Sequence, residues 1–188
     1  MSSSIDAPDW STLPKPIDDG AARHLTRMAI PHGSLRATDG TQVDLSALRG
    51  IVVVYAYPRT GQPGIPNPDG WDLIPGARGC TPQACAFRDN FVELKSLGVS
   101  HLFGLSTQSN AYQQEAAERL HLPFPILSDE AFQLTTALQL PTFETSGMTL
   151  LKRLTLIIHN GRIERVFYPV FPPDQNASQV LAWVKDHQ

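Results

Sequence analysis

An unbroken run at 51–57, in which all residues but Ala56 are β-branched or aromatic, limits the folds that this chain can adopt. The run reads Ile-Val-Val-Val-Tyr-Ala-Tyr and shows no alternation of polar and apolar positions. Such a run is typical of a central strand that is buried on both faces of a sheet. A sheet that is buried on both faces needs helices on each side, so the run predicts an α/β domain.

The remaining hydrophobic patterns agree with this architecture. Asn160-Gly161 is a strong two-residue hairpin signal, and Asp39-Gly40 is a second one. The order of strands and helices predicts a central mixed β-sheet flanked by helices. Helices are predicted at 21–28, 81–96, 110–120, 131–140 and 177–187. Two short strands around the Asp39-Gly40 turn are predicted within 35–45, and further strands at 99–106, 123–129 (a short strand or turn), 148–158 and 162–168.

Length and composition exclude several classes of function. The 188 residues suffice for one domain, predicted at 21–188, with residues 1–20 as a proline-containing extension. The net charge is −3 and the charges are interspersed, so no nucleic-acid partner is expected. No apolar run approaches the roughly 20 residues of a membrane span, so no membrane partner is expected either. The polar N-terminus lacks the pattern of a signal peptide, which predicts a cytoplasmic protein.

The two cysteines of the chain, Cys80 and Cys85, lie in the segment Gly-Cys-Thr-Pro-Gln-Ala-Cys. Thr81 followed by Pro82 is a helix-start signal, with a hydroxyl as N-cap and then proline at the first helical position. Cys80 is therefore expected at or just before the first turn of a helix. Unpaired amide groups and the positive end of the helix dipole favour a thiolate there, and the thiolate is the nucleophile.

The spacing of the two cysteines indicates a conformational change. On one regular helix, residues five positions apart have Cα atoms roughly 8–9 Å apart. A disulfide requires a Cα separation below about 7 Å. The pair therefore predicts two states: a folded helix with a reactive thiolate, and a locally unwound form with a disulfide.

Metal binding is not predicted. The six histidines are scattered, and two cysteines five residues apart would need two remote ligands to complete a zinc site. A Gly-rich phosphate loop is also missing. In a reducing compartment, a close cysteine pair favours catalytic or redox-sensing chemistry over a structural disulfide.

The segment Gly-Cys-Thr-Pro-Gln-Ala-Cys-Ala-Phe-Arg-Asp resembles the active-site segment of the peroxiredoxins, in the Q-type or bacterioferritin-comigratory-protein-like branch of the AhpC/TSA-redoxin superfamily. That branch typically shows Pro-Gly-Cys-Thr-x-Glu-Ala-Cys-x-Phe-Arg-Asp. The resemblance covers roughly residues 30–188 and implies a thioredoxin-like fold. Further matching stretches are 40–50, 104–106, 124–129 and 152–163.

The resemblance implies a thiol peroxidase that acts without a cofactor. By position, Cys80 would be the peroxidatic cysteine, which becomes a sulfenic acid, and Cys85 the resolving cysteine, which forms an intramolecular disulfide with it. Arg153 matches the arginine that supports the thiolate. The implied partners are a hydrogen peroxide or organic hydroperoxide substrate and thioredoxin or a similar dithiol, in a monomer or homodimer.

The chain departs from the family motif before Cys80. The motif's proline and threonine positions are occupied by Leu73 and Ala77, as if the segment 61–78 were inserted into the motif. Thr60 is therefore predicted to take the place of the motif threonine and to donate a hydroxyl to the peroxide. The inserted loop could cover the site and shape its access. Gln83 replaces the motif's glutamate and removes a charge near the thiol.

A second class of function is compatible with the same cysteines. A thiol-based redox sensor or interaction protein would undergo the same oxidation once, with little peroxide turnover. Turnover with a dithiol reductant would distinguish an enzyme from such a sensor. A dithiol oxidoreductase of the thioredoxin type is disfavoured, because its cysteines are normally separated by two residues.

Overall fold

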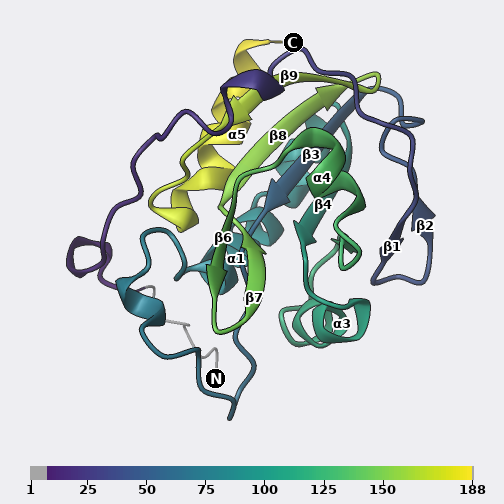
Figure 1. The fold of residues 1–188 in the computed structure, drawn as a ribbon. Helices are drawn as coiled ribbons and strands as arrows, with labels where there is room; N and C mark the ends of the chain where they lie inside the picture. The colour runs from purple at the N-terminus through teal and green to yellow at the C-terminus, as the bar shows by residue number, and fades with distance from the viewer. Residues whose placement is uncertain (1–7, 188) are drawn as a thin grey trace.

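The structure is a computed structural model that describes residues 8–187, and its central sheet has seven strands (Figure 1). The strand order is β2-β1-β5-β4-β3-β8-β9. The three middle strands β3, β4 and β5 are parallel, and the other pairs are antiparallel. The predicted mixed sheet is thus confirmed. The bounds are β1 (Leu35–Ala37), β2 (Gln42–Val43), β3 (Ile51–Ala56), β4 (Val99–Ser106), β5 (Ile126–Ser128), β8 (Leu154–His159) and β9 (Arg162–Phe167).

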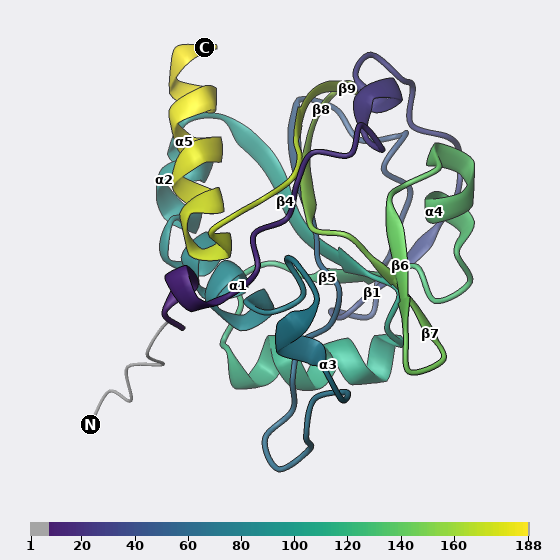
Figure 2. The ribbon, with the colours of Figure 1, turned by 60° about the vertical axis from the view of Figure 1, so that its left-hand side comes forward.

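Strand β3 explains why helices cover both faces of the sheet. Val52 and Val54 face one apolar cluster, while Val53 and Tyr55 face the other. Helices α1, α2 and α5 cover one face, α4 covers the other, and α3 lies next to β5 (Figure 2). The bounds are α1 (Cys80–Asp89), α2 (Phe91–Ser96), α3 (Asn110–Arg119), α4 (Gln133–Leu138) and α5 (Asn176–Asp186).

The helix predicted at 81–96 differs from the structure at its start and in its middle. It begins at Cys80, with Gly79 in the N-cap position at a φ of 109°, so the prediction of Thr81 as N-cap is wrong. Pro82 nevertheless lies in the first turn. Backbone N–H groups there have no partner within the helix, so proline costs the helix no hydrogen bond. A non-helical residue, Asn90, divides the segment into α1 and α2.

The strand predicted at 148–158 is two strands that belong to different sheets. Strand β7 (Met148–Leu151) pairs with β6 (Thr142–Thr145) in a separate two-stranded sheet, whereas β8 belongs to the central sheet. Strand β6 was not predicted. Arg153 lies between β7 and β8 and not within a strand, so strand alternation does not set its direction. The helix predicted at 21–28 is only a single 3₁₀ turn, Arg23–Leu25.

The segment between β3 and α1 is irregular but has a small apolar core of its own. Trp71, in the short 3₁₀ helix Trp71–Leu73, is 4% exposed. Its ring packs with Ala77 and Leu150, and it lies 6.4 Å from the ring of Phe143. The inserted loop is therefore anchored to the β6–β7 sheet.

The described part of the predicted N-terminal extension, residues 8–20, lies against the domain. Trp10 donates from Nε1 to Asp174 Oδ2 at 2.9 Å, and its ring meets Phe171 edge-on at 6.1 Å. Asp19 pairs with Lys152 at 2.6 Å. These contacts place the arm next to the start of α1 and α5 (Figure 2). Residues 1–7 of the predicted extension fall outside the described residues.

Candidate active site

Cys80 is the first residue of α1 and lines a pocket of about 310 Å³. Its side chain is almost entirely buried, with 4% of the residue exposed. The amide groups of a helix's first turn have no partner within the helix, so this position favours a negatively charged sulfur. The pocket is lined by Pro8, Arg59, Gly61, Asn67, Trp71, Arg78, Gly79, Cys80, Thr81, Pro82 and Arg119.

Arg153 supplies a cation directly beside this sulfur. Its Nη2 lies 3.2 Å from Cys80 Sγ, although 73 positions separate the two residues. The same nitrogen donates to the carbonyl oxygens of Gly76, Ala77 and Arg78 at 3.2, 3.2 and 3.3 Å. Arg153 is 3% exposed. The guanidinium is therefore held rigidly. It contacts the Cys80 sulfur and attaches the end of the inserted loop to the site.

A hydrogen-bonded network of neutral side chains orients Arg153. Gln83 accepts a hydrogen bond from Arg153 Nη1 at 2.5 Å and donates from Nε2 to Asn176 Oδ1 at 3.0 Å. Thr155 donates to the same Asn176 oxygen at 2.6 Å. Gln83, Thr155 and Asn176 are all fully buried. Sequence reasoning missed Thr155 and Asn176, because their pairing depends on packing between α1, β8 and α5.

Cys85 lies on the same helix as Cys80, and both thiols are free. Its side chain is half-buried and packs against the apolar cluster beneath α1. Partial burial raises the pKa of the Cys85 thiol, and the guanidinium of Arg88 opposes part of that rise. In the folded helix, Cys85 is thus held mainly as a protonated thiol.

Thr60 is buried, with 2% of the residue exposed, and its hydroxyl faces Gln108 Oε1 at 3.5 Å. Its amide donates to the same oxygen at 3.1 Å. The residues on either side of it, Arg59 and Gly61, line the Cys80 pocket, but Thr60 does not. Its suggested role as a donor to the peroxide stays a prediction.

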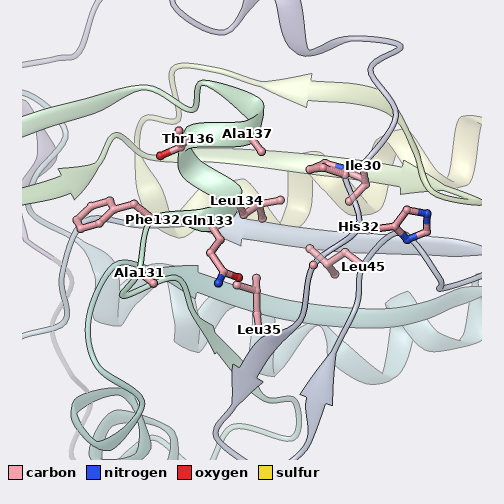
Figure 3. A pocket seen from close by; sticks show the side chains of 12 residues that line it. Ile30, His32, Leu35, Leu45, Ala131, Phe132, Gln133, Leu134, Thr136 and Ala137 are labelled. Atoms are coloured by element: carbon pink, nitrogen blue, oxygen red, sulfur yellow. The ribbon is translucent and has the colours of Figure 1, made fainter.

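A larger cavity of about 610 Å³ lies away from both cysteines, between α4 and the chain around Ile30 and Leu45 (Figure 3). Its walls are mostly apolar, and its polar side chains are His32, Gln133 and Thr136. The larger cavity is therefore not the one that Cys80 lines.

Within residues 8–187, no helix is long and apolar enough to cross a membrane, and no cluster of three or more acidic, histidine or cysteine side chains is placed to hold a metal.

Gly79 allows two distant segments to pack on the start of α1. A Cβ atom at this position would lie 2.6 Å from Pro173 Cγ and 2.8 Å from Trp10 Cη2. We expect Gly79→Ala to lower the free energy of unfolding by about 2–4 kcal/mol, because both the positive φ and the overlap are unfavourable. Thermal or denaturant unfolding measures this change.

Gly40→Ala is the matched control for that prediction. Gly40 also has a positive φ, of 87°, but a Cβ atom added there would meet no other atom within 4 Å. It should therefore show only the backbone effect, about 1 kcal/mol. Equal losses of stability in the two variants would contradict the packing role of Gly79.

A thioredoxin-like sheet with an arginine-supported cysteine at the start of a helix defines a class of thiol-based redox proteins. Comparison with known proteins agrees with this class, since the family model described as Redoxin matches residues 26–181. The chain belongs to the Redoxin family, among its peroxiredoxins of the Bcp and Q type.

Individual relatives support the family assignment. The chain is 35% identical over 162 residues to Peroxiredoxin Bcp of Escherichia coli (strain K12), covering 84% of this chain and 93% of that protein. It is 33% identical over 155 residues to the chloroplastic Peroxiredoxin Q of Oryza sativa subsp. japonica, covering 81% of this chain and 63% of that protein. The chain thus spans less than two thirds of the rice relative.

A solved structure agrees with the fold. The crystal structure of Peroxidoxin BcpB from Mycobacterium tuberculosis superposes with a TM-score of 0.69 at 26% identity, covering 87% of this chain and 97% of that chain. The predicted thioredoxin-like fold is therefore confirmed.

Proposed function

We propose that this protein is a thiol peroxidase that reduces hydrogen peroxide and organic hydroperoxides through Cys80. The observation that carries the proposal is the 3.2 Å contact between Arg153 Nη2 and Cys80 Sγ at the wall of a pocket. A cation in contact with a buried cysteine stabilises the nucleophilic thiolate. Membership of a family whose named relatives are peroxiredoxins supports the same reaction.

The first step is attack of the Cys80 thiolate on the distal oxygen of the hydroperoxide. A sulfur–oxygen bond forms and the oxygen–oxygen bond breaks, so the sulfur is oxidised by two electrons to a sulfenic acid. The alkoxide or hydroxide that leaves takes up a proton and departs as an alcohol or water. Arg153 is placed to stabilise the negative charge that moves from sulfur to oxygen in this step.

The second step joins the two cysteines. The Cys85 sulfur attacks the sulfenic sulfur, a disulfide forms, and hydroxide leaves as water after taking up a proton. On the intact helix α1 the Cα atoms are about 8–9 Å apart by helix geometry, so the first turns must unwind. Unwinding would also release Cys85 from the burial that raises its pKa.

The reductant would be thioredoxin or a similar dithiol, which restores both thiols by disulfide exchange. Thr60 would donate its hydroxyl to the bound peroxide, after turning from Gln108 toward the neighbouring pocket. A cytoplasmic location and a monomeric or homodimeric state remain predictions. The chloroplastic name of the rice relative shows that the location varies among relatives.

The test is peroxide consumption with thioredoxin, thioredoxin reductase and NADPH, in wild type and in Cys85→Ser. We expect the wild type to consume many equivalents of peroxide. The Cys85→Ser variant should undergo the first oxidation at the wild-type rate but form no intrachain disulfide, as mass spectrometry would show. A wild type that is oxidised once and then stops would favour the redox-sensor function over the peroxidase.

A further inference from the structure

Three arginines line the wall of the Cys80 pocket. These are Arg59, Arg78 and Arg119, and no aspartate or glutamate among the described residues lines it. They come from three places in the chain: the segment just after β3, the end of the inserted loop and the end of α3. How strongly each guanidinium group attracts an anionic occupant depends on whether a carboxylate of the protein already pairs with it.

Two of these arginines are already neutralised by carboxylates outside the pocket. Arg78 pairs with Asp72 at 2.5 Å. Arg119 pairs with Glu115, from Nε to Oε1 at 2.6 Å and from Nη2 to Oε2 at 3.3 Å. Their positive charge is largely balanced before any ligand arrives.

Arg59 differs from Arg78 and Arg119 because no carboxylate of the described residues pairs with it. Its Nη1 is buried and has no hydrogen-bond partner among the described residues. Its Cζ lies 5.3 Å from the centroid of the Tyr112 ring, which supports the guanidinium from one face. Tyr112 is fixed in turn by a 2.8 Å hydrogen bond from its hydroxyl to the carbonyl oxygen of Thr60. A buried unpaired donor is unfavourable. Because Arg59 also lines the pocket, a turn of its guanidinium toward the pocket would let a carboxylate oxygen satisfy this donor with a charge-assisted hydrogen bond.

Resting on the proposed peroxidase function, we propose that this pocket selects hydroperoxides that carry a carboxylate close to the peroxide group, and that Arg59 binds the carboxylate. Such a substrate has to bring a negative charge toward the Cys80 thiolate. Arg153 balances the thiolate, whereas Arg59 balances the incoming carboxylate. The small pocket volume, about 310 Å³, favours short substrates. The substrate reacts as described above: its oxygen–oxygen bond breaks and it leaves as a hydroxy acid.

The inserted loop completes this pocket. Asn67, Trp71 and Arg78 of the loop form one wall, and the carbonyl oxygen of Gly61 receives a 3.0 Å hydrogen bond from Arg119 Nη2. The loop thereby holds Arg119 beside the pocket. The selectivity is a property of the loop and the arginines together.

The experiment compares two probes that differ by one carboxylate group: tert-butyl hydroperoxide and its analogue in which one methyl hydrogen is replaced by a carboxylate. Stopped-flow tryptophan fluorescence gives the second-order rate constant for Cys80 oxidation, since Trp71 lines the pocket. We expect wild type to prefer the anionic probe by about tenfold at low salt, with a smaller preference at high salt. In Arg59→Gln, this ratio should fall to about one, while Arg59→Lys should retain most of it.

Arg49→Gln is the matched control, because Arg49 is exposed and lies at the opposite end of β3 from Arg59. It carries the same charge change and should keep the wild-type ratio. A wild-type ratio of one or less, or an unchanged ratio in Arg59→Gln, would overturn the proposed selectivity while leaving the peroxidase intact. If hydrogen peroxide oxidises Cys80 but neither probe does, the selectivity is overturned and the peroxidase remains. If hydrogen peroxide also fails to oxidise Cys80, the peroxidase function itself fails and the selectivity fails with it.

Discussion

Cys80→Ser is expected to reduce peroxide consumption to the uncatalysed background. A serine hydroxyl at the same position is not ionised near neutral pH, so no nucleophile faces the pocket. The side chain is nearly isosteric, and the hydrogen bonds from Arg153 to the carbonyl oxygens of Gly76, Ala77 and Arg78 do not involve the sulfur. The variant should therefore fold, and its loss of peroxide consumption should come from the missing nucleophile.

The measurement is consumption of hydrogen peroxide with a dithiol reductant, with circular dichroism and thermal unfolding as checks on the fold. Cys85→Ser serves as the comparison, because it retains the Cys80 thiol and should still react once. Continued turnover by a folded Cys80→Ser protein would show that another group reduces the peroxide.

Arg153→Met is expected to slow the oxidation of Cys80 by roughly 10²-fold, the effect of removing one preorganised donor from a charged reacting centre. The substitution removes the cation that lies 3.2 Å from the sulfur. It also leaves three loop carbonyl oxygens and the Gln83 side chain without their donor. Because the Ala77 carbonyl oxygen and the Gln83 side chain are buried, a loss of stability of about 1–3 kcal/mol should accompany the slower reaction.

Arg153→Lys separates these two effects. A lysine retains the positive charge but cannot contact the sulfur, Gln83 and the loop carbonyl oxygens together. We expect an intermediate rate constant and a stability close to that of Arg153→Met. Stopped-flow oxidation, and alkylation of Cys80 by iodoacetamide across a pH series, measure the reactivity. Wild-type reactivity in Arg153→Met would exclude Arg153 from thiolate stabilisation.

Local patterns were sufficient to predict the core of the fold and the position of Cys80 at the start of a helix. The apolar run at 51–57 forms β3, which is buried on both faces. The hairpin signal at Asn160-Gly161 lies between β8 and β9. Cys80 starts a helix, as its sequence context indicates, although the N-cap is Gly79 and not Thr81. These features depend on residues within a few positions of one another.

What could not be predicted depends on contacts between remote segments. Thr81 had the appropriate side chain for an N-cap, but Trp10 and Pro173 pack where only Gly79 fits. The strand predicted at 148–158 breaks before Arg153, whose guanidinium then reaches Cys80. No local pattern indicates that Asn176 is buried beneath Gln83 and Arg153.

The packing around Gly79 also bears on how quickly the protein can pass between its thiol and disulfide forms. Trp10 comes from one end of the chain and Pro173 precedes the last helix at the other end, and both press on the residue from which α1 unwinds. If the proposed unwinding of α1 begins at this turn, the segments that carry Trp10 and Pro173 would have to move away from it. In the proposed reaction, contact of Trp10 and Pro173 with Gly79 would slow the pairing of the cysteines, and their departure would expose new tryptophan and proline surface on the oxidised protein.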